Sequence, residues 1–174
     1  CKMEHTLEFR RLNREEAPQM FQLIRQRMSW MDEKGLRQWN VTGYEEAYPL
    51  AYYEQAQQDG QAFGLFDSWT GELLCAAVIL ENDSRWQGDA TPALYIHNFA
   101  SQVGRPGMGK AFLERLEAYA VSRGKDFLRL DSAEDNEALA RYYAALGFQP
   151  VGTCREGPYY CGILRQRAIK KSAV

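Results

Sequence analysis

The stretch VGRPGMGKAF, residues 103–112, combines residue types that hold phosphate groups. Gly107 and Gly109 lack a Cβ, so consecutive backbone N–H groups can converge on an anion there. A helical pattern begins at Gly109, and the N-terminus of a helix favours negative charge. Arg105 and Lys110 add two mobile positive charges. The stretch therefore predicts a site for a phosphate or pyrophosphate.

Read from Gly104, the same stretch also satisfies G-x-x-x-x-G-K, the phosphate loop of nucleotide-triphosphate enzymes up to its last position. That position holds Ala111, which has no hydroxyl for a magnesium ion. Only one candidate for a parallel strand follows the loop, whereas the core of such an enzyme needs several. These departures count against a P-loop phosphotransferase, which stays an alternative.

A second group of polar residues follows the next predicted strand. The segment DNEALARYYAALGF, residues 135–148, sets Asn136, Tyr143 and the pair Gly147–Phe148 at fixed offsets on a predicted helix. One helical step turns a side chain by about 100 degrees, so Tyr142 and Tyr143 cannot face the same partner. We expect one of the two to face a ligand and the other to pack or meet solvent.

Motifs, spacing and order of elements together resemble the GNAT superfamily of acetyl-CoA-dependent N-acetyltransferases over about residues 6 to 167. Its members typically show a strand, an [QR]-x-x-G-x-[GA] loop, a helix, a strand, and then N-x-x-A-x-x-x-Y-x-x-x-G-F. The resemblance implies an α/β fold with a mixed, mostly antiparallel sheet of about seven strands, a splayed parallel pair and helices on both faces. The loop departs from the pattern, since Gly104 takes the Gln/Arg position and the connection SQVG is about two residues short.

The resemblance also implies a cofactor site. The pantetheine arm would bind main-chain groups of the strand LYIHNFAS, around Phe99, Ala100 and Ser101, where an N–H could polarise the thioester carbonyl. Its pyrophosphate would be held by Arg105, Pro106, Gly107, Met108, Gly109 and Lys110. Tyr143 would protonate the departing CoA thiolate, and Asn136 would be a cofactor-side or helix-capping group.

The base that deprotonates the amine stays open. His97 has a suitable intrinsic pKa, Glu81 ends the preceding strand and Asp131 ends the following one. A buried hydrogen-bonded role for His97 and a loop-anchoring role for Asp131 are the competing interpretations, as is a base that acts through ordered water.

The segment SWMDEKGLRQWN, residues 29–40, is similar to a signature that a subset of these enzymes carries near the substrate mouth. Trp30, Gln38 and Trp39 could line an acceptor pocket, with Glu81 on the substrate side. The alternative is that the tryptophans only pack helices onto the sheet. Tyr159 and Tyr160 are further candidates for the pocket wall.

These residues need a scaffold, and periodicity predicts its elements. The expected order is one strand, two helices, three strands, a helix, a strand, a helix and two strands. The expected strands span 6–13, 61–67, 72–82, 93–100, 126–132, 148–154 and 159–166; the expected helices span 14–35, 43–60, 109–123 and 136–146. Pro49 is expected to disturb the second helix.

Composition sets the remaining bounds. The length of 174 residues predicts a single domain. The resemblance implies that it is an N-acetyltransferase domain over 3–170, after Cys1 and Lys2 and before a basic tail at 171–174. A net charge of −2 and a pI near 5.8 argue against a nucleic-acid partner, and no stretch is apolar enough for a membrane span. The cysteines lack metal-ligand spacing, so we expect no metal and a reducing cytoplasm.

The predicted activity is transfer of an acetyl group from acetyl-CoA to a primary amine by direct attack in a ternary complex. Cys75 lies in the apolar run LLCAAVIL, which argues against a covalent acyl-enzyme. A catalytically inactive acyl-CoA-binding or sensing module of the same fold is the alternative. Polyamine, aminoglycoside, amino acid, peptide terminus and lysine all stay open as acceptors, and homodimers are common in the family.

Overall fold

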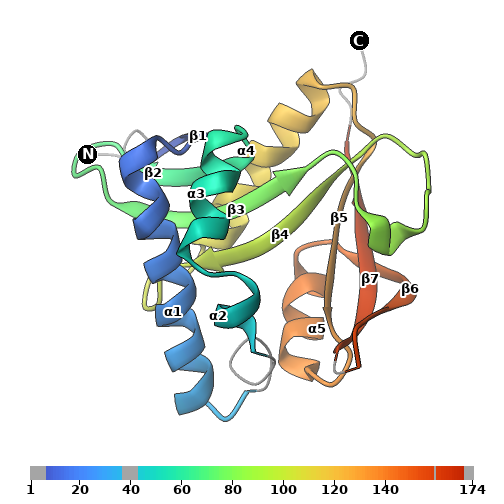
Figure 1. Cartoon of the computed structure of the whole chain (residues 1–174). Coiled ribbons are helices and arrows are strands. Elements are labelled where there is room, and N and C mark those ends of the chain that lie inside the picture. The colour runs from blue at the N-terminus through green and yellow to red at the C-terminus, as the bar shows by residue number, and fades with distance from the viewer. Residues whose placement is uncertain (1–6, 37–42, 159, 171–174) are drawn as a thin grey trace. The chain divides into compact units, whose positions relative to one another are not determined.

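A computed structural model describes residues 7–36, 43–158 and 160–170 (Figure 1). Within them the strands are β1 (Leu7–Arg11), β2 (Ala62–Asp67), β3 (Leu73–Leu80), β4 (Ala93–Ser101), β5 (Phe127–Ala133), β6 (Gln149–Glu156) and β7 (Tyr160–Ala168). The α-helices are α1 (Ala17–Glu33), α2 (Tyr44–Ala47), α3 (Leu50–Gln58), α4 (Met108–Ser122) and α5 (Glu137–Ala145). Two short 3₁₀ helices, η2 (Arg14–Glu16) and η4 (Ser84–Trp86), complete the set.

The strands form one mixed sheet in the order β1-β2-β3-β4-β5-β7-β6. Among the registers of the described residues, β4 and β5 pair in parallel, whereas β1–β2, β2–β3, β5–β7 and β6–β7 are antiparallel. The predicted fold class is therefore confirmed. A phosphate loop of the nucleotide-triphosphate type belongs to a mainly parallel sheet, so this alternative is excluded.

The chain divides into two compact units, which are described separately below. The first comprises residues up to Ile79 together with His97–Arg115, and the second comprises Leu80–Ile96 and the residues from Leu116 onward. The division passes through strand β4 and helix α4, so each of these elements contributes residues to both units.

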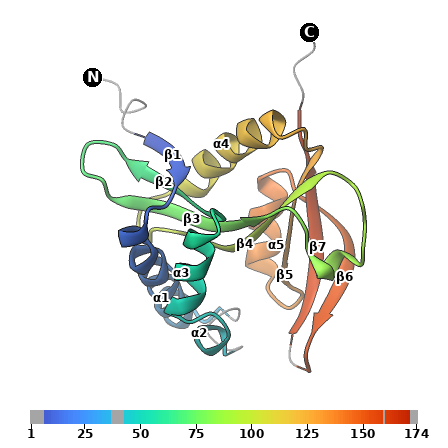
Figure 2. The same cartoon turned by 45° about the horizontal axis from the view of Figure 1, so that its top comes forward.

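In the first unit, β2 and β3 form the predicted antiparallel hairpin next to β1. Asp67 closes the turn, because its carboxylate accepts the N–H groups of Trp69 and Thr70 at 2.9 and 3.3 Å. Helices α1 and α3 lie side by side in both cartoon views (Figure 2). Their inward faces carry Met20, Ile24 and Tyr53, each at most 1% exposed, as the amphipathic pattern predicts.

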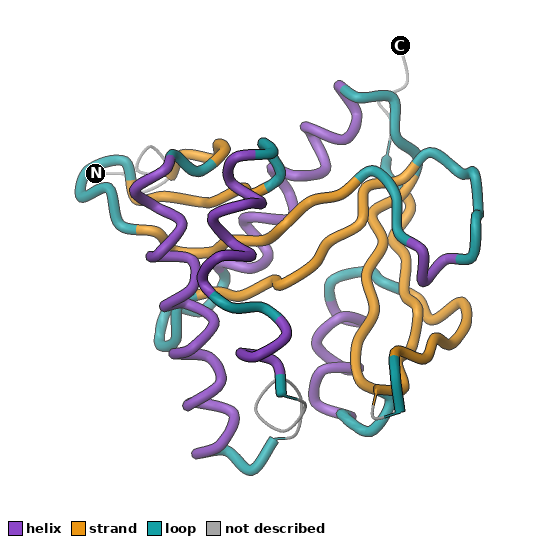
Figure 3. The backbone as a smooth tube through the Cα atoms, in the orientation of Figure 1, coloured by secondary structure: helices purple, strands orange, loops and turns teal. Residues whose placement is uncertain are grey.

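The segment predicted as one helix over 43–60 is two helices, α2 and α3 (Figure 3). Pro49 precedes α3 with an extended backbone, and Tyr48 before it leaves the helical region at φ −128° and ψ 70°. A proline has no N–H to donate and disfavours a helical residue before it, so the break falls where the irregularity was expected.

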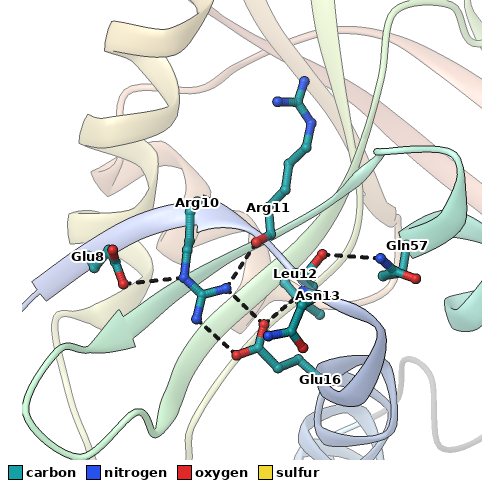
Figure 4. A network of polar contacts seen from close by, with 7 residues as sticks. All are labelled: Glu8, Arg10, Arg11, Leu12, Asn13, Glu16 and Gln57. Atoms are coloured by element: carbon teal, nitrogen blue, oxygen red, sulfur yellow. Dashed lines mark hydrogen bonds and ion pairs between the residues drawn. The ribbon is translucent and has the colours of Figure 1, made fainter.

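The entry into α1 is held by a polar network that also reaches β1 (Figure 4). The backbone N–H of Asn13 donates to the Glu16 carboxylate at 2.8 Å, which is half of a helix-capping box. Arg10 donates to both Glu16 oxygens, at 2.8 and 2.9 Å. This bidentate pair joins β1 to Glu16, the last residue of η2 and the N-cap of α1.

In the second unit, β5 pairs with β7 from Phe127 to Ala133 without interruption, and β6 pairs with the other edge of β7. Trp86 of η4, Ala93 and Tyr95 of β4, and Leu164 of β7 form a buried cluster. Over the part of the chain that the structure describes, no helix is long and apolar enough to cross a membrane.

Candidate functional site

The last five residues of β4, His97 to Ser101, belong to the first unit and are held from two sides. The Phe99 ring packs against Phe112 of α4 with 5.6 Å between centroids, and Ala100 is buried. Arg27 of α1 donates to the Ser101 carbonyl at 2.7 Å and to its hydroxyl at 3.1 Å. The Ser101 carbonyl that was predicted to meet a pantetheine arm thus already accepts one hydrogen bond.

The glycine stretch makes a turn and then starts α4. Gly107 has φ +88°, and its carbonyl accepts the N–H of Ala111 at 3.0 Å, the first helical hydrogen bond. The N–H groups of Met108, Gly109 and Lys110 precede that bond, so they have no acceptor within the helix. A Cβ added at Gly107 would meet no described atom within 4 Å, so glycine is required there by backbone conformation rather than by crowding.

The turn between β4 and α4 is anchored by polar side chains of the same unit. Glu72 accepts from Gln102 at 2.7 Å and from Arg105 at 3.2 Å, and Gln26 of α1 accepts the Val103 N–H at 3.4 Å. The Arg105–Glu72 pair is about half exposed on both sides. Arg105 is therefore held in place by a weak, solvent-screened contact that a stronger anion can displace.

Strand β4 departs from regular geometry at Asn98, which has φ +55° and is 7% exposed. Tyr52 donates its hydroxyl hydrogen to the Asn98 amide oxygen at 2.8 Å, and the amide nitrogen donates to the Tyr44 hydroxyl. Burial raises the pKa of Tyr44, so this phenol stays neutral. Its neighbour His97, predicted as a base, lies half-buried on the same strand. Sequence reasoning missed Asn98, because its partners lie far away in the chain.

The second motif lies in the second unit, on α5. Tyr143 is 7% exposed and packs edge-on against Phe148 at 5.8 Å, whereas Tyr142 is 41% exposed. The structure thus separates the two tyrosines as the helical geometry predicts, with one inside and one outside. The role of the Tyr143 hydroxyl stays a prediction.

The two ends of α5 explain the spacing between Asn136 and the pair Gly147–Phe148 in the second motif. Asn136 caps the helix, since its side-chain oxygen accepts the Leu139 N–H at 2.9 Å. At the other end Gly147 has φ +89°, and the Phe148 N–H donates to the Tyr143 carbonyl at 3.0 Å. This is a Schellman motif, which favours glycine at that position. The capping interpretation of Asn136 is confirmed, and its cofactor role stays a prediction.

Two of the candidate bases are ion-paired within the second unit. Glu81 contacts Lys125 at 2.8 Å and Arg123 at 3.4 Å, and the Lys125 hydrogen bond lowers the pKa of Glu81. Asp131 contacts Arg85 at 3.2 Å and accepts the Tyr160 hydroxyl at 2.5 Å. A carboxylate held by cations is a weak proton acceptor, so these contacts favour anchoring roles.

On the predicted substrate side, Trp30 of α1 lies in the first unit with the Arg27 guanidinium 4.8 Å above its ring. Gln38, Trp39 and Tyr159 lie outside the described residues. Tyr160 donates its hydroxyl hydrogen to Asp131 in the second unit. The acceptor pocket therefore stays a prediction.

Two of the described cysteines, Cys75 and Cys154, lack the features of a nucleophile. Cys75 is fully buried in β3, and burial raises the pKa of its thiol. Burial likewise raises the pKa of Cys154 to about 11. Neither thiol is activated in the sense of a lowered pKa, which agrees with direct transfer.

Comparison with known proteins identifies the protein family to which this fold and the glycine turn before α4 belong. The model of the acetyltransferase (GNAT) family matches residues 22–148. The chain therefore belongs to the GNAT family of acetyltransferases and is an acyltransferase. No curated protein sequence matches it.

Solved structures show the same fold at low sequence identity. A GNAT-family acetyltransferase from Listeria monocytogenes is 22% identical, with a TM-score of 0.73 over 93% of this chain and 94% of that chain. The PaiA N-acetyltransferase from Thermoplasma acidophilum, solved with coenzyme A, is 15% identical with a TM-score of 0.70 over 93% and 98%. The ribosomal-protein-S18-alanine N-acetyltransferase from Escherichia coli is 18% identical with a TM-score of 0.63 over 96% of both chains.

Proposed function

We propose that this protein transfers the acetyl group of acetyl-CoA to a primary amine by direct attack in a ternary complex. The amine nitrogen bonds to the acetyl carbon, the carbon–sulfur bond breaks, and the amine loses a proton while the thiolate gains one. The observation that carries the proposal is the start of α4, where three consecutive N–H groups precede the first helical hydrogen bond in a chain of this family.

The donor set at that helix start fits a pyrophosphate. The N–H groups of Met108, Gly109 and Lys110 supply hydrogen bonds, and the helix dipole adds a favourable potential. Arg105 and Lys110 supply positive charge, the first through an exposed pair that can open. Main-chain groups of Phe99, Ala100 and Ser101 are proposed to bind the pantetheine arm. The coenzyme A bound to the Thermoplasma PaiA enzyme is consistent with this proposal.

Tyr143 is proposed as the proton donor to the leaving thiolate. A phenol placed near the sulfur can donate its proton as the tetrahedral intermediate collapses. The Tyr143 ring is fixed by burial and by Phe148, which limits the positions that the hydroxyl can take. His97, or water held by several polar groups, is proposed to take the proton from the amine, because Glu81 and Asp131 are ion-paired.

The test is thiol release from acetyl-CoA with a panel of amines: a polyamine, an aminoglycoside, amino acids, a lysine peptide and a peptide with N-terminal alanine. We expect turnover with at least one, and Tyr143→Phe should lower kcat about 100-fold with little change in the KM for acetyl-CoA. Tyr142→Phe is the matched control, since this neighbouring ring is exposed, and it should keep the wild-type rate. Equal rates for Tyr143→Phe and wild type would overturn the proton-donor role.

A binding or sensing module gives a different result in the same experiment. It would bind acetyl-CoA, which calorimetry measures, and would release no thiol with any amine of the panel. The proposed activity is then wrong even though the cofactor site is real.

A further inference from the structure

Asn98 stands out in β4 because of its backbone. Among the described residues other than glycine, only Gln87 and Asn98 have a positive φ. Gln87 is the exposed residue that caps the end of η4, whereas Asn98 is buried inside a strand. The left-handed region is costly for residues with a Cβ, and asparagine is among those that tolerate it best. The chain therefore accepts strain at one interior position of this strand.

The Asn98 side chain explains why asparagine, and not glycine, occupies this position. Its amide oxygen accepts from the Tyr52 hydroxyl at 2.8 Å, and its amide nitrogen donates to the Tyr44 hydroxyl. These tyrosines lie on α3 and α2, so the bent residue is bonded to two helices of its own unit. Glycine would adopt the same φ at lower cost but would leave both phenols without this amide.

Ring packing holds the two hydroxyls in place. Tyr48 lies between its partners, with ring centroids 4.7 Å from Tyr44 and 4.7 Å from Tyr52. Tyr52 in turn packs against the buried Tyr53 at 5.1 Å. A phenol fixed by its ring cannot follow a moving amide, so the clamp formed by Tyr44, Asn98 and Tyr52 resists any change at the bend.

We propose that Asn98 is a positioning residue for acetyl transfer, held by Tyr44 and Tyr52, and that it sets the direction of the main-chain groups on either side of it. This inference rests on the proposed function, which assigns the neighbouring Phe99 main chain to the cofactor. A bulge-like step leaves peptide groups of a strand out of the regular ladder, where they can bind a ligand. Asn98 itself does not touch the reacting atoms in this proposal.

The expected signature is a loss in kcat rather than in KM. An N–H that polarises a carbonyl is needed most as negative charge develops on the oxygen, so a small misorientation costs more in the transition state than in binding. Asn98→Gly keeps the backbone and removes the clamp, and we expect kcat to fall about 10-fold. Asn98→Ala loses both the left-handed backbone and the clamp, and we expect kcat to fall about 100-fold. A loss of this size is typical when one hydrogen-bond donor to a developing oxyanion is removed.

Substitutions of the tyrosines supply a mutant cycle with Asn98 and a control variant. Tyr44→Phe and Tyr52→Phe should each lower kcat several-fold, and adding both to Asn98→Gly should cause little further loss because the hydroxyls then lack their shared partner. Tyr48→Phe is the control, since its ring lies in the same stack but its hydroxyl is not one of the two that bond Asn98.

The readouts are kcat and KM for acetyl-CoA, with the number of competent sites counted by acetyl-CoA calorimetry. If Asn98→Gly and Asn98→Ala reduce only the thermal midpoint or the number of competent sites, and kcat per site is unchanged, Asn98 is merely structural and the proposal is overturned. A Tyr48→Phe variant that loses as much kcat as Tyr52→Phe also overturns it.

A calorimetric comparison separates this proposal from the proposed function. If wild type binds acetyl-CoA but acetylates no amine, the proposed activity is wrong, and the clamp is judged by the ratio of acetyl-CoA to CoA affinity. Asn98→Ala should reduce that ratio, because the misdirected N–H contacts the acetyl carbonyl that CoA lacks. An unchanged ratio overturns the clamp, and absence of acetyl-CoA binding by wild type overturns both proposals.

Discussion

Strands β4 and β5 both bury polar side chains, but they hold them by different chemistry. In β4, Asn98 has neutral partners and a left-handed backbone. In β5, Asp131 has the charged partner Arg85 and the Tyr160 hydroxyl, and its backbone pairs with β7 at every position from Phe127 to Ala133. Along its β7 edge the main chain of β5 is fully engaged in the sheet, whereas a bent strand can turn main-chain groups toward a ligand.

The charges of the two polar groups support the same contrast between an anchoring role in β5 and a ligand-positioning role in β4. The side chains of Asp131 and Arg85 are 7% and 16% exposed, so removal of one partner would leave a charge in a poorly hydrated site. Such a pair holds the local fold in a single arrangement. A neutral amide between two phenols avoids that penalty and can sit beside a reacting centre without changing its charge.

The largest expected effect tests whether the turn after β4 binds the ligand. Gly107→Val should weaken acetyl-CoA binding about 100-fold, because a β-branched residue is strained at φ +88° and its side chain would shield the first N–H groups of α4. Gly104→Val is the matched control, since Gly104 has φ +84° and similarly open surroundings among the described residues. Calorimetry of both variants decides: equal losses would mean that strain alone, and not the helix start, controls binding.

The next effect tests the anchoring role of the β5 network. Arg85→Met should lower the free energy of unfolding by about 2–4 kcal/mol, because it leaves Asp131 buried without its cation. Arg155→Met, at an exposed arginine of β6, should change it by less than about 0.5 kcal/mol. Urea denaturation measures both. A loss of kcat in folded Arg85→Met without loss of stability would contradict the contrast between the two strands.

The smallest expected effect tests whether the stabilisation by an ion pair comes from its charge alone or depends on its burial. Arg10 and Glu16 form a charged pair like Arg85 and Asp131, but their side chains are 35% and 10% exposed. The Arg10 hydrogen bond lowers the pKa of Glu16 below its usual 4.5, so the folded protein binds this proton less tightly than the unfolded chain. The pair therefore stabilises the fold above the unfolded pKa, and its contribution is lost as pH falls through the lower, folded pKa.

Glu16→Gln measures that contribution. We expect wild type to exceed the variant by about 1 kcal/mol in free energy of unfolding at pH 7, after allowance for solvent screening, and the difference to shrink below about pH 4. Denaturation series at several pH values provide the test. A difference that grows toward acid would show that the carboxylate is held by something other than its hydrogen bond to Arg10.

Local patterns predicted most of the scaffold. The strands and helices lie close to their predicted ranges, and the break at Pro49 falls where a missing N–H demands it. The motif around α5 was equally readable, because a cap at Asn136 and a left-handed Gly147 depend on neighbours a few residues away. Tyr143 and Tyr142 separate into buried and exposed side chains by helical geometry alone.

The polar partners were not readable, because they join residues far apart in the chain. Asn98 bonds Tyr44 and Tyr52 across 54 and 46 positions, and Asp131 pairs with Arg85 across 46. Single-residue patterns carry no information on such pairs. For the same reason the sequence placed Glu81 and Asp131 among the bases, whereas their cations in the structure favour anchoring.

The amino-acid sequence by itself thus determined the order of elements, the glycine turn that starts α4 and the family to which the chain belongs, because each depends on residue type and short spacing. Only the tertiary structure decided which carboxylates are neutralised, that Arg105 is paired with Glu72, and that β4 bends at an asparagine held by two phenols. Those features depend on which distant side chains meet once the sheet and helices have packed, and local propensity does not specify such meetings.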